Sequence, residues 1–345
     1  MDYRALADRV LAGGSPTREE GAAILEGPEE DLLLLLDAAF RVRRRHFGRT
    51  VQIHVLTNAK SGLCPEDCAY CSQSSVSSAG IDHYSLVDED RLLEEAGRAA
   101  ESGARRFCIV TSGRGPAAAE IERLEAAVRR IKSVHGMSVC CSLGLLDEGQ
   151  AQRLRAAGVD RLNHNLNTSE SFYPSICSTH TYRDRLATLE AARRAGLELC
   201  SGVIFGQGES REDVLDVCEA LRRLAPESIP VNFLHPVPGT PLEGVPPLGP
   251  TRCLRLLSLV RLFNPRSEVR VAGGREVQLR ELQPLALYPA NSLFVSGYLT
   301  TPGQSAEEAH RMIRSLGFEV DAEGGADPHP PRREGGDRSG ASLLS

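Results

Sequence analysis

Residues 106–143 read RFCIVTSGRGPAAAEIERLEAAVRRIKSVHGMSVCCSL and contain the unit from which the fold is inferred. The short apolar run Arg106–Thr111 predicts a buried strand, and the amphipathic stretch after it predicts a helix. Gly136 then stands where a helix C-terminus favours a residue that tolerates positive φ, and Ser138–Leu143 is the next apolar run. Strands that alternate with helices are typical of a parallel sheet.

The same unit recurs along most of the chain. The eight candidate strands are Gln52–Leu56, Arg106–Thr111, Ser138–Leu143, Arg161–Leu166, Glu198–Phe205, Ile229–Leu234, Glu268–Ala272 and Ser292–Ser296. Gly103, Gly158 and Gly196 precede further runs as Gly136 does. We therefore expect an α/β fold, most simply a (β/α)8 TIM-type barrel, with its active site at the C-terminal ends of the strands. Periodicity alone leaves a doubly wound open sheet as the alternative.

The two ends of the chain differ from this repeat. Arg18–Leu25 and Asp31–His46 carry apolar residues at helical spacing, which predicts an N-terminal helical extension over residues 1–48. The barrel is expected over residues 49–320. Residues 321–345 contain few apolar side chains, and we expect them to form a disordered C-terminal tail.

Composition limits the class of protein. The formal net charge of −6 argues against a nucleic-acid-binding surface, which needs clustered Lys and Arg. No apolar stretch approaches the ~20 residues of a membrane span, and the first residues lack the apolar core of a signal peptide. Ten cysteines in such a chain indicate a reducing compartment, so we expect a cytoplasmic protein whose thiols serve as ligands or nucleophiles.

Three cysteines lie close together directly after the first predicted strand, in the loop CPEDCAYC at residues 64–71. Thiolates are the usual ligands of iron–sulfur clusters, and three ligands for a four-iron cube leave one iron open to a small molecule. A zinc site would need a fourth ligand, and neither His54 nor His83 has the usual zinc spacing. The loop contains Gly and Pro and is not a core pattern, so the triplet Cys64, Cys68 and Cys71 favours a [4Fe–4S] cluster.

Polar side chains also interrupt six successive predicted strands. They are Cys108, Cys140 or its neighbour Cys141, the period-two set Asn163, Asn165 and Asn167, Cys200, Asn232, and Arg270. An unpaired polar group in a core costs on the order of a few kcal/mol, so we expect these residues to bind a ligand or one another. Taken singly, each cysteine is better explained as a small buried apolar side chain. The set as a whole favours a buried site.

The triplet resembles the signature of radical S-adenosylmethionine (SAM) enzymes, with Tyr70 as its aromatic residue. This resemblance implies that SAM binds the open iron. Residues 202–209, GVIFGQGE, resemble the superfamily's G-x-I-x-G-x-x-E segment near the adenine. The resemblance therefore implies cofactor-binding roles for Tyr70, Gly202, Ile204 and Glu209.

Further stretches resemble the biotin synthase family, in that family's order. They are 106–108 (RFC), 140–144 (CCSLG), 163–169 (NHNLNTS), 200–202 (CSG), 239–242 (GTPL), 269–276 (VRVAGGRE) and 299–303 (LTTPG). The resemblance covers about residues 45–320 and implies that Cys108, Cys140, Cys200 and Arg270 hold a [2Fe–2S] cluster. A guanidinium is protonated at any ordinary pH, so Arg270 is open to two other roles: neutralising the cluster's charge or binding a substrate carboxylate. Cys141 could add a ligand and enlarge the cluster.

What the resemblance implies is an enzyme, a sulfurtransferase that inserts sulfur into dethiobiotin to form biotin. SAM would be cleaved at the [4Fe–4S] cluster, and the [2Fe–2S] cluster would donate the sulfur. The chemistry is cluster- and radical-based, so no acid–base residue is expected. Asn163, Asn165 and Asn232 would contact the ureido group, because amides offer both donors and acceptors. Asn165 and Asn167 would lie near the nucleoside ribose, although many family members carry Asp where this chain has Asn167.

The same resemblance implies a flavodoxin or ferredoxin reductant, iron–sulfur assembly proteins and a second copy of the chain as partners. Two other functions stay open. Another radical barrel enzyme, of the hydrogenase-cofactor maturation type, would share the triplet but not the asparagines together with Arg270. A non-catalytic iron–sulfur sensor or carrier would need no substrate-sized polar cavity. Cys141, Cys177, Cys218 and Cys253 have no predicted role.

Overall fold

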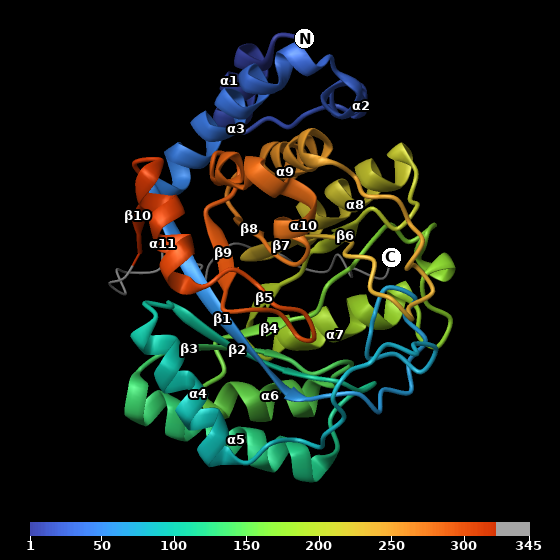
Figure 1. Cartoon of the computed structure of the whole chain (residues 1–345), viewed down its shortest axis with the longest axis vertical. Coiled ribbons are helices and arrows are strands. Elements are labelled where there is room, and N and C mark those ends of the chain that lie inside the picture. The colour runs from blue at the N-terminus through green and yellow to red at the C-terminus, as the bar shows by residue number, and fades with distance from the viewer. Residues whose placement is uncertain (322–345) are drawn as a thin grey trace.

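The chain closes into a parallel barrel, as a computed structural model that describes residues 1–321 shows (Figure 1). The strands, in order around the barrel, are β1 (Thr50–Lys60), β2 (Arg106–Thr111), β3 (Ser138–Ser142), β4 (Arg161–Asn163), β5 (Glu198–Cys200) with β6 (Val203–Phe205), β7 (Ser228–Phe233), β8 (Glu268–Val271) and β9 (Ser292–Val295). Parallel pairing of β9 with β1 closes the ring, with Gln52 opposite Ser292. The predicted barrel is confirmed, and the open sheet is excluded.

Helices follow the strands and surround the barrel. They are α4 (Glu89–Glu101), α5 (Ala118–His135), α6 (Glu148–Ala157), α7 (Tyr182–Arg194), α8 (Arg211–Leu224), α9 (Pro250–Phe263), α10 (Arg275–Leu279) and α11 (Ala306–Ser315), with 3-10 turns at Tyr173–Ser175 and Arg280–Leu287. Side chains of Asp88, Asp147, Thr181 and Ser210 cap four of their N-termini. Gly136 ends α5 at a φ of 62°, as its position in the sequence predicts.

Three further helices precede the barrel and lie together at one end of the molecule (Figure 1). They are α1 (Tyr3–Leu11), α2 (Arg18–Glu26) and α3 (Leu32–Phe47), with a 3-10 turn at Glu29–Asp31 before α3. Leu35, Leu36 and Val42 of α3 are buried in the same apolar core as the barrel helices. After α11, the short strand β10 (Glu319–Val320) pairs with the start of β1. Residues 322–345, most of the predicted disordered tail, lie outside the described residues.

Two predicted strands are shorter than the sequence suggests, and both breaks lie at the same place in the barrel. The run Arg161–Leu166 ends as a strand at Asn163, and Glu198–Phe205 divides into β5 and β6. A Cβ on Gly202 would lie 1.8 Å from the Pro230 carbonyl oxygen, so only glycine fits at the second break. Asn167, at a φ of 69°, donates its backbone N–H to the Gly202 carbonyl at 3.0 Å. None of the helices in residues 1–321 is both long and apolar enough to span a bilayer.

Candidate functional site

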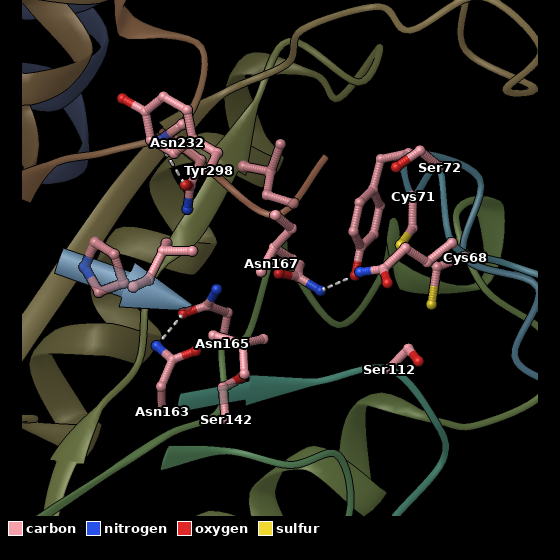
Figure 2. Close-up of a pocket in the computed structure, with 18 of the residues that line it drawn as sticks. Cys68, Cys71, Ser72, Ser112, Ser142, Asn163, Asn165, Asn167, Asn232 and Tyr298 are labelled. Carbon is pink, nitrogen blue, oxygen red and sulfur yellow. Dashed lines mark hydrogen bonds between the residues drawn. The ribbon is translucent and has the colours of Figure 1, made fainter. Parts of the chain in front are cut away.

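A cavity of about 400 Å³ collects almost all of the predicted site residues (Figure 2). Those that line it are Cys64, Cys68, Tyr70, Cys71, Cys108, Cys140, Asn163, Asn165, Asn167, Cys200, Ile204, Asn232 and Arg270. Gly202 and Glu209 are the predicted site residues that do not line it. The strand ends and the loops that follow them supply these side chains, as expected for a barrel of this kind.

A hydrogen bond from a side-chain amide helps to hold the loop that carries the cysteine triplet. Gln73 Oε1 accepts a hydrogen bond from the Gly62 N–H at 3.0 Å, which closes the loop on itself. Cys68 is buried, whereas Cys64 and Cys71 are half-buried. The three thiols do not converge as closely as the ligand atoms of Cys68, Cys177 and His180, which lie within 4.8 Å of one another. This wider spacing of the thiols fits a multi-iron cluster better than one zinc ion.

The two histidines considered as zinc ligands lie elsewhere. His54 is fully buried on β1, where its Nε2 is 3.2 Å from Glu268 Oε1. Burial, aided by the charge of Arg270, lowers the pKa of His54 to about 3, so the ring is neutral. His83 is exposed and lies over Gly62. Neither belongs to a group of metal-ligand atoms with the triplet.

A second set of thiols lies deeper in the barrel. Cys108, Cys140 and Cys200 form a buried cluster of their own, packed against Leu56 and Phe294. Cys108 and Cys140 stand directly opposite each other in the β2–β3 register. Hydrogen bonding to Cys108, together with burial, raises the pKa of Cys140 to about 12.

The neighbouring cysteine on β3 has a different environment. Cys141 is fully buried in the main apolar core and does not line the cavity. Adjacent residues of a strand face opposite ways, and the structure shows that Cys140 is the one facing inward. Cys141 is therefore not placed to add a ligand to the inner thiols.

Buried charges surround the inner thiols. Arg270 Nη1 lies 3.8 Å from Cys200 Sγ, while its Nη2 donates to Ser228 Oγ at 3.0 Å and to Glu268. Burial opposes the charge of this guanidinium, but the Glu268 carboxylate and the neighbouring thiols of Cys200 and Cys108 together outweigh burial and raise the pKa of Arg270. Arg270 is therefore a cation beside the thiols.

Several guanidinium N–H groups in this region have no partner among the described residues. They are Nε of Arg270 and both Nε and Nη1 of Arg106, whose side chain is 4% exposed. Buried donors without acceptors are costly, so an anionic group at the thiols would satisfy them. A cluster held by three thiolates is such a group, and the residues therefore fit it.

Three asparagines at and after the end of β4 line the cavity, and two of them are joined by a hydrogen bond (Figure 2). Asn163 Nδ2 donates to Asn165 Oδ1 at 3.2 Å and lies 3.2 Å from Cys200 Sγ. Asn165 Oδ1 also accepts the Gly202 N–H at 3.0 Å. Asn167 Nδ2 donates to the Tyr70 hydroxyl at 2.7 Å, which connects this asparagine to the loop of the triplet.

The fourth asparagine lies on β7, apart from the other three. Asn232 donates to the Val203 carbonyl at 3.0 Å and accepts the Gly273 N–H at 2.9 Å. These backbone contacts fix the orientation of its amide, which retains one N–H and one lone pair for a ligand.

Glu209 and Gly202 contribute to the shape of the site rather than to its lining. The Glu209 carboxylate accepts the N–H groups of Gly206 and Gln207, each at 2.7 Å, and so holds the loop after β6. Its own burial raises the pKa of Glu209. Gly202 permits β6 to approach Pro230 on β7.

Sequence reasoning missed Arg185, which lines the cavity from the first turn of α7. Its Nη1 donates to the Asn165 carbonyl at 2.9 Å, and its Nη2 lies 2.9 Å from His180 Nε2. Burial opposes its charge, but the neighbouring hydroxyl of Tyr70 and others raise the pKa of Arg185 above its ordinary value. The signal for it was its position: a charged residue at the start of a helix that follows a barrel strand faces the active-site end.

Comparison with known proteins agrees with this site. Residues 60–221 match the Radical SAM superfamily, and residues 230–319 match the Biotin and Thiamin Synthesis associated domain. The biotin synthase of Bacillus licheniformis is 53% identical over 317 residues, which cover 92% of this chain and 95% of that protein. The biotin synthase of Bacillus subtilis (strain 168) is 52% identical over the same shares of both chains.

Solved structures show the same fold at low identity. A methylornithine synthase superposes with a TM-score of 0.81 at 20% identity, covering 91% of this chain and 97% of that one. The FeFe-hydrogenase maturase of Carboxydothermus hydrogenoformans gives a TM-score of 0.78 at 17% identity, covering 92% and 79%. These likenesses concern the architecture alone.

Proposed function

The chain belongs to the biotin synthase family, and we propose that its barrel cavity is where sulfur is inserted into dethiobiotin. The activity is that of a sulfurtransferase, which converts dethiobiotin to biotin in the last step of biotin biosynthesis. One observation carries the placement: two separate sets of thiols and four asparagine amides line a single cavity. A sensor or carrier would not need that cavity, and the family membership excludes a hydrogenase maturase.

Cys64, Cys68 and Cys71 would hold the [4Fe–4S] cluster, and Cys108, Cys140 and Cys200 the [2Fe–2S] cluster, with the charged guanidinium of Arg270 at its fourth position as a counter-charge. When bound, the first cluster with SAM supplies a radical able to take hydrogen from a saturated carbon, and the second supplies the sulfur. The buried guanidinium groups of Arg270 and Arg106 would balance the negative charge of the inner thiolates.

The amides would bind the substrate and part of SAM. Asn163, Asn165 and Asn232 present donors and acceptors that match a cyclic urea. Asn167, held by Tyr70, would contact the ribose together with Asn165. Arg185 is a buried cation close to Tyr70 and Cys68, and this charge suits it to bind a carboxylate group.

The loop after β6 would form the adenine side of the SAM site. Ile204 supplies an apolar side chain to the cavity, while Gly202 and Glu209 hold the backbone around it. The walls of the cavity would keep water and other hydrogen donors away from the reacting carbon.

We further propose that a flavodoxin or ferredoxin supplies the electron, that iron–sulfur assembly proteins load both clusters, and that the chain works as a homodimer. All ten cysteines are free thiols, and six of them are proposed cluster ligands, which supports a reducing compartment such as the cytoplasm. The division into a helical segment (1–48), a barrel (49–320) and a tail (321–345) is retained as a proposal.

Anaerobic reconstitution with iron and sulfide analysis, followed by a single-turnover assay with dethiobiotin and SAM, tests the site. We expect about six irons per chain, and biotin formed. About four irons, with 5′-deoxyadenosine made but no biotin, would remove the inner cluster from the proposal. Failure to cleave SAM under strong reduction would favour a sensor.

A further inference from the structure

Cys177 belongs to neither thiol set, yet it lies beside one of them. It follows the short turn Tyr173–Ser175, and its Sγ is 3.8 Å from the Sγ of Cys68. The two residues are 5% and 8% exposed, respectively, and Cys68 lines the cavity. A small solute that enters the cavity therefore meets Cys68 with a second thiol directly behind it.

The backbones that carry these two cysteines are fixed to each other on both sides of the pair. On one side, the Ala69 N–H donates to the Ile176 carbonyl at 2.9 Å. On the other, Asp67 Oδ1 accepts the Ser178 N–H at 2.9 Å and the Thr179 N–H at 3.2 Å. Cys68 and Cys177 lie between these contacts, which hold the two backbones next to each other. A disulfide requires an S–S distance of about 2.0 Å, and it tolerates only a narrow range of separations between the two backbones.

Cys68, Cys177 and His180 also place ligand atoms within 4.8 Å of one another, which raises the alternative of a single metal ion. Both ring nitrogens of His180 are already engaged, however. Nδ1 faces the Glu66 carboxylate, and Nε2 lies 2.9 Å from both Tyr173 Oη and Arg185 Nη2. Arg185 can only donate, so Nε2 accepts and Nδ1 carries the proton. The imidazole therefore has no lone pair for a metal, and the chemistry left is that of two thiols.

We propose that Cys68 and Cys177 form a disulfide when the chain has no cluster at the triplet. With hydrogen peroxide as the oxidant, two thiols and one peroxide give one disulfide and two waters. The thiols lose two electrons and two protons, and the peroxide O–O bond breaks. The significance of the disulfide rests on the proposed function, in which Cys68 is a cluster ligand.

Two consequences distinguish this disulfide from incidental oxidation. It occupies Cys68, so the oxidised chain cannot load the [4Fe–4S] cluster until a dithiol reductant opens the bond. It also keeps Cys68 from oxidation to sulfinic acid, which is not reversed by thiols. Cys177 would thus preserve one of the three ligands, Cys68, in a chain that has lost its cluster.

The test uses the full cluster-free chain, prepared anaerobically and treated with a small molar excess of hydrogen peroxide. Non-reducing peptide mapping by mass spectrometry is expected to find the Cys68–Cys177 crosslink as the main disulfide. Crosslinks confined to Cys64, Cys68 and Cys71, or no crosslink, would overturn the proposal. This measurement needs no turnover, so it is independent of the activity assay.

A matched pair of variants tests the protection. Cys177→Ser and Cys253→Ser each remove one buried thiol, but Cys253 lies on α9, outside the loop and the turn that carry the pair. After peroxide and then dithiothreitol, we expect peptide mapping to find sulfinic acid at Cys68 at least about threefold more abundant in Cys177→Ser than in wild type or Cys253→Ser. Equal amounts in the two variants would contradict protection by Cys177. Should the crosslinked chain load the triplet cluster without reduction, the ligand role of Cys68 would fail while the disulfide itself stood.

Discussion

Arg161 donates from Nη1 to Glu268 Oε2 at 2.7 Å inside the barrel, and the two side chains are only 2% and 4% exposed. The other carboxylate oxygen of Glu268 accepts from Ser292 Oγ at 2.7 Å and from Arg270. The Glu268 carboxylate thus pairs with two buried guanidinium groups close to the inner thiols. The pKa of Glu268 lies well below its ordinary value because the nearby cations Arg270 and Arg161 outweigh the effect of burial.

Glu268→Gln should be strongly destabilising. It leaves Arg270 without its carboxylate partner and Arg161 with Glu198 alone, in a region that excludes water. Breaking a buried pair in this way costs about 3–5 kcal/mol. Urea unfolding of the cluster-free chain measures this loss. Glu94→Gln is the control, because Glu94 pairs with Arg98 on the exposed face of α4, where such a pair contributes about 0.3–0.5 kcal/mol. Similar losses in the two variants would show that the buried network does not hold the barrel together.

Stability should also fall with acidification because of His54. Its pKa is about 3 in the folded chain and about 6.5 when unfolded, so the unfolded chain binds the extra proton below pH 6.5. The contribution of His54 is therefore fully present above pH 6.5 and lost as the pH falls towards 3, by about 1.4 kcal/mol per pH unit.

His54→Asn removes the contribution of His54 to the pH dependence of stability. Between pH 7 and pH 5, the stability of wild type should fall by about 2 kcal/mol more than that of His54→Asn. His83→Asn, at an exposed position, should follow wild type. Urea unfolding at the two pH values measures the difference, and parallel curves for wild type and His54→Asn would show that the ring is not held neutral.

The two thiol sets should separate the two half-reactions. Replacing Cys64, Cys68 or Cys71 with Ala is expected to reduce SAM cleavage by at least about a thousandfold, since a coordination position is lost. Replacing Cys140 or Cys200 with Ala should leave cleavage within about threefold of wild type and abolish biotin formation. Separate quantification of 5′-deoxyadenosine and biotin tests this, with iron analysis as the control for the outer cluster. Loss of cleavage in Cys200→Ala, with the outer cluster intact, would contradict the division.

Gly202→Ala should disrupt the break between β5 and β6. The new methyl group would lie 1.8 Å from the Pro230 carbonyl oxygen, and backbone cannot yield as a flexible side chain does. We expect a loss of about 3 kcal/mol or more, the upper range for overpacking. Gly244→Ala, where a Cβ meets nothing within 4 Å, should change stability by less than about 0.5 kcal/mol. Thermal unfolding of both variants measures these changes in stability. A small loss in Gly202→Ala would show that β7 can shift to accommodate the methyl group.

Much of the fold followed from local patterns. Apolar runs and helix-ending glycines recur often enough along the chain to reveal the strands, and β2 has the bounds that its sequence predicts. The two shortened strands could not be predicted, because each ends where it meets a segment distant in sequence. Gly202 breaks its strand through contact with Pro230, and residue spacing carries no trace of that contact.

The site was predictable where the chemistry is concentrated in a motif. The triplet was found because three thiols lie within eight residues of one loop, and the inner cysteines because thiols rarely interrupt buried strands in such a series. Arg185 was missed because helix periodicity does not tell which end of a helix faces a cavity. His54 was considered only as a zinc ligand, since its partner Glu268 lies on the far side of the barrel closure and more than two hundred residues away.

The two thiol sets lie at different depths in the barrel, and this difference bears on the order of product release and cluster repair. Cys140 and Cys200 are 2% and 1% exposed, at the inner part of the cavity, whereas Cys64 and Cys71 are only half-buried in the loop that follows β1. If the substrate fills this cavity, as proposed, iron and sulfide that enter through it would reach the inner thiols only after biotin has left. Product release and repair of the inner cluster would then form one obligatory sequence.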